Sequence, residues 1–136
     1  MRQPMKQSIQ AGIYMRLSQD DEKQGESESI RSQRILLRQF VQEKGWPIVG
    51  EYVDDGYSGT NFDRPSFQRM MADVRSGKIN CIITKDMSRL GRNFIGVFQY
   101  LEEFLISRIR FIAVTDNEDT ANGLSDFAPF KCVFNE

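Results

Sequence analysis

The chain has 136 residues, of which 40% are hydrophobic and 27% charged, with a net charge of −1 and no histidine. This length suits a single domain with a buried core, and the near-neutral charge argues against a protein that holds nucleic acid through its overall charge. Because histidine is absent, Ser-His-Asp triads and histidine-based zinc sites are excluded, and any catalysis has to use Ser, Thr, Tyr, Lys, Arg, Asp or Glu.

The sequence also argues against a membrane or secreted protein. No stretch approaches the roughly 20 apolar residues of a membrane span, and the first ten residues contain no apolar run typical of a secretory signal. Cys81 and Cys132 stand far apart in apolar contexts without metal-ligand spacing, as is typical of reduced core thiols in a cytoplasmic protein. We therefore expect a cytoplasmic protein without a bound metal.

Basic residues are concentrated in the middle of the chain. Residues 75–110 carry seven Lys or Arg and three acids, whereas residues 20–28 carry five acids and one base. A site for a polyanion can therefore exist locally although the chain as a whole is slightly acidic.

Hydrophobic periodicity predicts alternating strands and helices in the first half of the chain. In chain order it predicts a strand over 9–17, a helix from Ser27 or Ser29 to about Lys44, a strand over 48–53, a polar loop over 54–64 and a helix that begins at Pro65. Gly45 is expected just past the end of the first helix, and Gly77 at the end of the second.

The second half continues this alternation. It predicts a buried strand over 79–84, a loop over 85–92, a helix capped by Asn93, a strand over 109–115, and finally a loop and a short helix from about Ser125. The stripe expected to bury the helix after Asn93 consists of Phe94, Val97, Phe98, Leu101 and Leu105.

Strands separated by single helices form βαβ units. The predicted fold is therefore α/β, with a mainly parallel sheet of four to five strands flanked by helices. Ligands of such sheets bind at the carboxyl ends of the strands. Ser18, the 54–64 loop and the 85–92 loop should converge there.

The segment Tyr14-Met15-Arg16-Leu17-Ser18 places Tyr14, Arg16 and Ser18 on one face of the first strand, because alternate residues of a strand share a face. An arginine beside a serine at a strand end suits the attack of a hydroxyl on a phosphate. A solvated edge strand with a capping serine would produce the same pattern.

Gln33 lies within the apolar stripe of the first predicted helix. A buried amide needs a partner, so Gln33 is either a core residue bonded to backbone or a residue that reaches the site. The glycine-containing loop after Asp54 can bring Ser58 and Arg64 to the same edge, although an ordinary surface loop has the same composition.

The stretch Lys85–Asn93 carries Arg89 and Arg92 three residues apart, next to the expected start of a helix. Arginines bind phosphate through two hydrogen bonds, and a helix N-terminus also attracts anions. An exposed pair of salt-bridging arginines is the alternative.

Together these segments resemble the serine recombinase family of resolvases, invertases and large transposon and phage integrases. The resemblance extends from about Ile13 to Glu136. The residues that match the family pattern are Tyr14, Arg16, Ser18, Gln33, Asp54, Ser58, Gly59, Asp63, Arg64 and Arg89–Arg92. The 54–65 loop and the 85–93 stretch are most similar to large serine recombinases of mobile elements in Gram-positive bacteria.

The resemblance implies DNA cleavage and rejoining in site-specific recombination through a covalent 5′-phosphoserine, followed by strand exchange and religation without ATP or a cofactor. Ser18 is the implied nucleophile. The implied partners are DNA and further copies of the chain, as a dimer and a synaptic tetramer. The other catalytic candidates are Arg16, Gln33, Asp54, Arg64, Arg89 and Arg92, and the substrate-binding candidates are Tyr14, Ser58 and Lys85.

These residues suggest individual roles. The arginines would stabilise charge on the phosphoryl oxygens, and Arg16 would also favour the ionised serine. Asp54 would handle a proton or orient an arginine, while Gln33 and Ser58 would position the phosphate or the nucleophile.

The chain departs from the family at Ser88, where many small resolvases have an aspartate. The acid-base role of that aspartate is therefore not transferred, and Asp86 need not replace it. A metal-independent phosphohydrolase and an inactive DNA-binding or oligomerisation module remain alternatives. We also expect residues 1–136 to be a catalytic domain that stops before the family's long dimerisation helix and DNA-binding domains, so that alone it would bind DNA and dimerise weakly.

Overall fold

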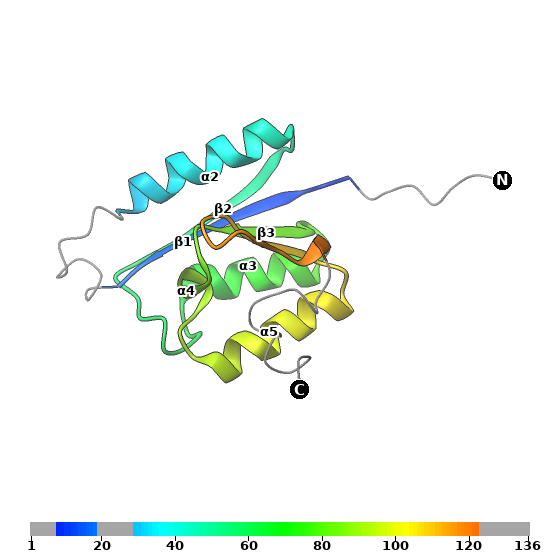
Figure 1. Cartoon of the computed structure of the whole chain (residues 1–136). Helices are drawn as coiled ribbons and strands as arrows, with labels where there is room; N and C mark the ends of the chain where they lie inside the picture. Colours follow the sequence, from blue (N-terminus) through cyan, green and yellow to red (C-terminus); the bar gives the residue numbers. More distant parts are fainter. Residues whose placement is uncertain (1–7, 19–28, 123–136) are drawn as a thin grey trace.

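The computed structural model describes residues 8–18 and 29–122, which form a five-stranded sheet with helices on both faces (Figure 1). The sheet order is β2-β1-β3-β4-β5. The first four strands are parallel, and β5 runs antiparallel to β4. The predicted α/β fold is thus confirmed. The strands are β1 (Ala11–Leu17), β2 (Ile48–Asp55), β3 (Cys81–Thr84), β4 (Arg110–Ala113) and β5 (Glu118–Asp119).

Helix α2 (Ile30–Lys44) covers one face of the sheet, and α3 (Pro65–Arg75) and α5 (Phe94–Ile106) cover the other (Figure 1). The alternation of side chains along β1 divides the core between these layers. Ile13 and Met15 pack in the cluster beneath α2, whereas Tyr14 packs in the cluster formed with α3 and α5.

Local chemistry explains where the helices begin and end. The side chain of Ser29, not Ser27, caps α2 by accepting a hydrogen bond from Ser32 N, and Gly45 closes this helix with a left-handed φ of 74°. Pro65 occupies the first turn of α3, where its missing N–H has no cost. Asn93 caps α5, as predicted.

Strand β1 is an interior strand, flanked by β2 and β3, and every residue of it is buried. The alternative of a solvated edge strand is therefore wrong. Tyr14 and Arg16 are fully buried, and Ser18, which follows the strand, is 7% exposed.

The predicted stripe of α5 is partly wrong. Val97 and Leu101 are buried as expected, but the third buried position is Phe104, while Phe94 and Leu105 are 57% and 50% exposed. Phe94 and Leu105 lie close to the two ends of the helix. The helix has more apolar residues than one buried face can hold.

Other differences concern short elements. The predicted 85–92 loop contains a one-turn helix, α4 (Met87–Leu90), and the 3-10 turn η1 (Thr120–Asn122) follows β5. The helix expected from Ser125 and the thiol of Cys132 lie outside the described residues. Burial raises the pKa of the Cys81 thiol to about 12, as befits a core residue. None of the described helices is long and apolar enough to cross a membrane.

Candidate active site at the carboxyl edge of the sheet

Ser18 directly follows β1 at the carboxyl edge of the sheet, beside the end of β2, whose Asp54 pairs with Arg16 in the strand register. The guanidinium of Arg16 contacts both neighbouring segments: Nη1 donates to Tyr57 O (3.0 Å) and Nη2 donates to Ser88 O (2.6 Å). The predicted convergence of Ser18, the 54–64 loop and the 85–92 segment is therefore confirmed.

Arg16 holds these segments together. Besides the two contacts above, its Nε donates to Arg89 O over 3.2 Å. Three of the five N–H donors of the guanidinium are thus bonded to main-chain carbonyls. The side chain is fully buried, so its positive charge is fixed close to the end of β1.

The side chain of Gln33 is bonded to backbone, which was one of the two roles that the sequence left open for it. Its Oε1 accepts from Arg16 N (3.3 Å) and its Nε2 donates to Arg16 O (3.1 Å). Strand β3 pairs with β1 only as far as Ile13, so the amide takes the place of a neighbouring strand beyond that point. Arg89 Nη1 donates to the same carbonyl over 3.1 Å. Gln33 therefore contributes to the site by fixing the backbone two residues before Ser18.

Asp54 is a structural centre of the site. Its Oδ1 accepts from Ser66 N, and its Oδ2 accepts from Phe67 N, each over 2.9 Å. Oδ2 also accepts from Tyr14 Oη over 2.8 Å. The carboxylate thus binds the N–H groups at the start of α3 and is 2% exposed. This arrangement favours an orienting role and leaves little access for proton transfer to a substrate.

Tyr14 connects Asp54 with Arg64, whose Nη1 donates to Tyr14 Oη over 2.8 Å. Burial, the largest influence, and the neighbouring carboxylate raise the pKa of the Tyr14 hydroxyl, while Arg64 opposes this. Tyr14 therefore stays protonated and can donate to Asp54.

Arg64 is fully buried and makes contacts on all sides. Nε donates to Asn61 O (2.9 Å), and Nη2 donates to Leu90 O (2.7 Å). Its guanidinium also stacks near the rings of Phe62 and Phe67, at 5.0 and 4.9 Å from their centroids. This environment favours a role in joining the 54–64 loop to α4.

The hydroxyl of Ser58 bonds within its own loop. Ser58 Oγ and Thr60 Oγ1 are 2.8 Å apart, and Ser58 Oγ accepts from Thr60 N over 3.0 Å. Ser58 is exposed, whereas the next residue, Gly59, is buried against Arg16. A Cβ at Gly59 would lie 2.9 Å from Arg16 Nη2 and 3.0 Å from Arg92 Cγ, so only glycine lets the loop pass this closely.

The sequence interpretation missed Phe62. Its ring lies against Gly91 and Gly96, where a Cβ on Gly91 would approach Phe62 Cζ to 2.7 Å and a Cβ on Gly96 would overlap the ring. Phe62 also packs against Phe67 and Tyr100, with ring centroids 5.2 and 4.7 Å apart. The signal in the sequence was the pair of glycines that flank the start of α5.

The 85–92 segment presents the remaining candidates. Arg89 is buried. Arg92 is exposed just before α5, and its backbone N–H donates to Gly59 O over 2.7 Å. Lys85 Nζ lies 3.7 Å from Asp86 Oδ2. Of the two arginines predicted to bind phosphate together, Arg92 is thus the one on the surface.

Residues 11–128 match the sequence model of a protein family, the N-terminal domain of resolvases. The chain belongs to this family. A putative DNA recombinase of Bacillus subtilis (strain 168) is 32% identical over 83 residues, which cover 61% of this chain but 16% of that relative.

Two solved structures resemble the chain over most of its length. The N-terminal catalytic domain of TP901-1 integrase has a TM-score of 0.79 at 24% identity and covers 93% of this chain, and the chain covers 91% of it. A resolvase family site-specific recombinase from Streptococcus pneumoniae has a TM-score of 0.75 at 28% identity, with 94% and 87% covered. The chain therefore has the fold of a serine recombinase catalytic domain.

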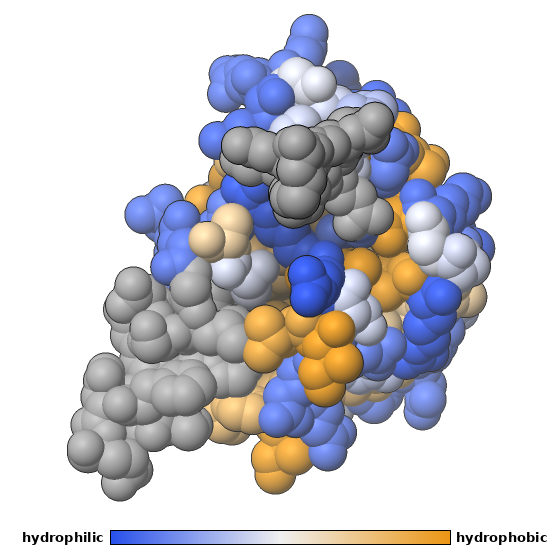
Figure 2. All heavy atoms as spheres, turned by 90° about the vertical axis from the view of Figure 1, so that its right-hand side faces the viewer, coloured by the Kyte–Doolittle hydropathy of each residue, from blue (hydrophilic) through white to orange (hydrophobic). Residues whose placement is uncertain are grey.

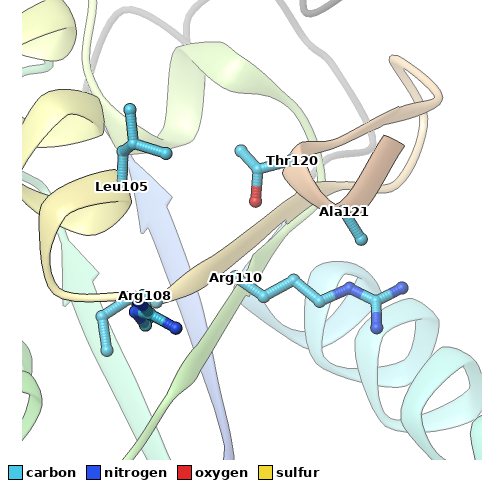
Figure 3. A pocket seen from close by; sticks show the side chains of 6 residues that line it. Leu105, Arg108, Arg110, Thr120 and Ala121 are labelled. Atoms are coloured by element: carbon cyan, nitrogen blue, oxygen red, sulfur yellow. The ribbon is translucent and has the colours of Figure 1, made fainter. Parts of the chain in front are cut away.

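A hollow of about 390 Å³ lies between the end of α5, the start of β4 and η1 (Figure 3). It lies at the amino edge of the sheet. Arg110, which lines the hollow, pairs with Cys81, and Cys81 pairs with Ala11, so all three residues begin their strands at this edge. This hollow is therefore far along the sheet from its carboxyl edge.

Figure 2 shows the molecule from the right-hand side of Figure 1, with hydrophobic residues gathered on part of that face. Exposed Leu105 and Ile106 at the end of α5 are 50% and 80% accessible. This hollow is separate from Ser18.

Proposed function

We propose that the chain cleaves and rejoins DNA in site-specific recombination, with Ser18 as the nucleophile that forms a 5′-phosphoserine. One observation carries this proposal: Ser18 follows the buried strand β1, and the end of this strand is held in place. Gln33 and Arg89 bind the carbonyl of Arg16, and the side chain of Arg16 binds the carbonyl of Arg89. A hydroxyl on such rigid backbone can be aligned for in-line attack on phosphorus. The 3′-oxygen of the deoxyribose leaves, and the phosphoserine conserves the energy needed for religation without ATP.

Arginines supply the positive charge for the transition state. Arg92 is exposed and is therefore the first candidate to contact the phosphate, while Arg89, buried three residues before it, would add positive charge from beneath. Arg16 adds a fixed buried charge near Ser18. Lys85, at the same edge, adds attraction for the DNA backbone, and Tyr14, Asp54 and Arg64 hold the two loops in place. Ser58 would contact DNA from the exposed loop.

The reaction should need no metal ion. In the part of the chain that the structure describes, no three His, Cys, Asp or Glu side chains are grouped as metal ligands, and arginines can provide the electrostatic stabilisation that a metal would give. Cleavage by the full-length recombinase should therefore survive excess EDTA. Loss of cleavage on chelation, restored by magnesium, would contradict this.

Recombination requires further copies of the protein. We propose that the full-length protein, belonging to a bacterial mobile element, acts as a dimer and a synaptic tetramer on DNA in the cytoplasm. Residues 1–136 alone would bind DNA weakly and form loose dimers. Analytical ultracentrifugation and DNA titration of this chain test that expectation, and tight, sequence-specific binding would contradict it.

The decisive experiment locates the covalent bond. The full-length recombinase is trapped on a nicked duplex that carries its recombination site, and the adduct is digested with trypsin. We expect the phosphate on the peptide that begins at Leu17, no adduct with Ser18→Ala, and a reduced but detectable adduct with Ser58→Ala. Retained DNA binding by Ser18→Ala is the control. A phosphate on Ser58 or Tyr14 would refute the mechanism.

A further inference from the structure

Asp54 is poorly placed to accept the proton of Ser18 during the proposed attack. Both oxygens of that carboxylate are bonded to the start of α3 and to Tyr14, and the side chain is almost completely buried. A serine hydroxyl is a weak nucleophile unless its proton is removed, so another group near the end of β1 has to accept this proton.

Asp86 has the surroundings of such a group. Its Oδ1 accepts a hydrogen bond from Ser88 Oγ over 2.5 Å. Its Oδ2 lies 3.7 Å from Lys85 Nζ and 3.8 Å from Arg89 Nε. The Asp86 side chain is 19% exposed, so it is partly shielded but still open to the edge of the sheet.

Asp86 is not needed to cap α4, although it precedes this helix. Its side chain makes no capping hydrogen bond. Instead, Oδ2 of Asp116, from the loop between β4 and β5, accepts from Met87 N over 2.8 Å. Asp116 thus accepts from the first N–H of α4. The carboxylate of Asp86 is therefore available to the hydroxyl of Ser88 and to the cations Lys85 and Arg89.

The Asp86 and Ser88 pair is also tied to the strand that leads to Ser18. Arg16 Nη2 donates to the carbonyl of Ser88 over 2.6 Å, and Arg89 Nη1 donates to the carbonyl of Arg16 over 3.1 Å. These two bonds fix the 86–89 turn against the end of β1. The hydroxyl of Ser88 is thus held at the same sheet edge as the proposed nucleophile.

We propose that Ser88 and Asp86 form a proton relay for the cleavage step, an inference that rests on the proposed function. As the lone pair of Ser18 Oγ forms the bond to phosphorus, the Ser18 proton passes to Ser88 Oγ and the Ser88 proton passes to Asp86 Oδ1. The bond between phosphorus and the 3′-oxygen breaks with its electron pair on that oxygen. The 3′-oxygen takes a proton from solvent water, and Asp86 returns its proton to Ser18 Oγ through Ser88 when the DNA is rejoined, so no co-reactant is consumed.

The charges around the relay come from three elements. Lys85 and Arg89 flank Asp86 within its own segment, Arg16 reaches Ser88 from β1, and Asp116 approaches from the loop after β4. Lys85, Arg89 and Arg16 thus surround the proposed relay with positive charge.

The test measures the rate of Ser18 adduct formation by the full-length recombinase on a nicked recombination site at constant pH. We expect Asp86→Asn to slow cleavage by at least about 100-fold, in line with lost general base catalysis. Asp86→Glu should restore part of the rate. Ser88→Ala should slow cleavage by at least about tenfold, since water can partly replace a hydroxyl.

Asp116→Asn is the matched control, because it removes a carboxylate that contacts the same turn from another loop but keeps an oxygen that can accept from Met87 N. It should keep the wild-type cleavage rate. Thermal unfolding of each variant precedes the kinetics, and Ser88→Ala, which keeps all the charges, provides the test if Asp86→Asn does not fold.

The outcomes separate the relay from the proposed function. Wild-type rates in both Asp86→Asn and Ser88→Ala would overturn the relay and leave the phosphoserine mechanism standing. Absence of a Ser18 adduct in the wild-type protein would overturn the proposed function and the relay together.

Discussion

The packing of Phe62 against Gly96 can be tested with a single methyl group. Gly96 lies in the first turn of α5, where replacement of glycine by alanine normally stabilises a helix by about 1 kcal/mol. In this protein the new Cβ would overlap Phe62 Cε2 and lie 3.2 Å from Phe62 Cδ2 and Cζ. Overpacking of this kind costs about 1–3 kcal/mol. We therefore expect Gly96→Ala to lower the free energy of unfolding by up to about 2 kcal/mol.

Removal of the ring should reverse the sign of this effect. In a Phe62→Ala background, Gly96→Ala should stabilise the protein by about 1 kcal/mol, because only the helix propensity remains. Phe62→Ala itself should cost about 3 kcal/mol, since the ring packs against Phe67, Tyr100 and Arg64.

Urea denaturation of the wild type, the two single variants and the double variant measures all three differences. If Gly96→Ala has the same effect in both backgrounds, the overlap with Phe62 is not its cause and the reasoning is refuted. A stabilising Gly96→Ala in the wild-type background would refute it as well.

Three further substitutions test the structure elsewhere. Arg108 has a φ of 60° at the end of α5, so Arg108→Gly should stabilise the fold by about 1 kcal/mol, seen as a higher urea midpoint; a lower midpoint would contradict this. Tyr14→Phe removes a buried hydroxyl bonded to Asp54 and should cost about 1–3 kcal/mol; an unchanged midpoint would show that the bond contributes nothing. The hydrogen bond from Arg38 holds the pKa of Glu51 below its normal value of 4.5. The stabilisation is therefore present above that value and lost as pH falls through the lower, folded-state pKa. Glu51→Gln should lower the melting temperature at neutral pH, with a difference that shrinks on acidification; a constant difference would exclude this cause.

The sequence by itself determined the elements whose causes are local. Ser29, Gly45 and Pro65 mark helix ends through bonds and dihedral angles that involve residues at most a few positions away. The alternation along β1 likewise predicted that Tyr14 faces away from Ile13 and Met15. The order of the longer strands and helices therefore followed from the sequence, as did the edge at which the candidate residues meet, whereas the short α4 and β5 did not.

Only the tertiary structure decided what those residues do there. Gln33 could equally have reached a ligand or a carbonyl, and its partner proved to be the backbone of Arg16, 17 positions away. The acceptor of Arg16 Nε is 73 positions away. The carboxylate of Asp54 is hydrogen-bonded to the start of α3 and to Tyr14. Asp116 accepts from the first N–H of α4 in place of Asp86. The carboxylate of Asp86 therefore binds Ser88 instead. Such assignments depend on which distant groups fill a side chain's hydrogen-bonding capacity. That competition is settled by packing, because each buried polar group has to find its partner among the segments that the fold brings together.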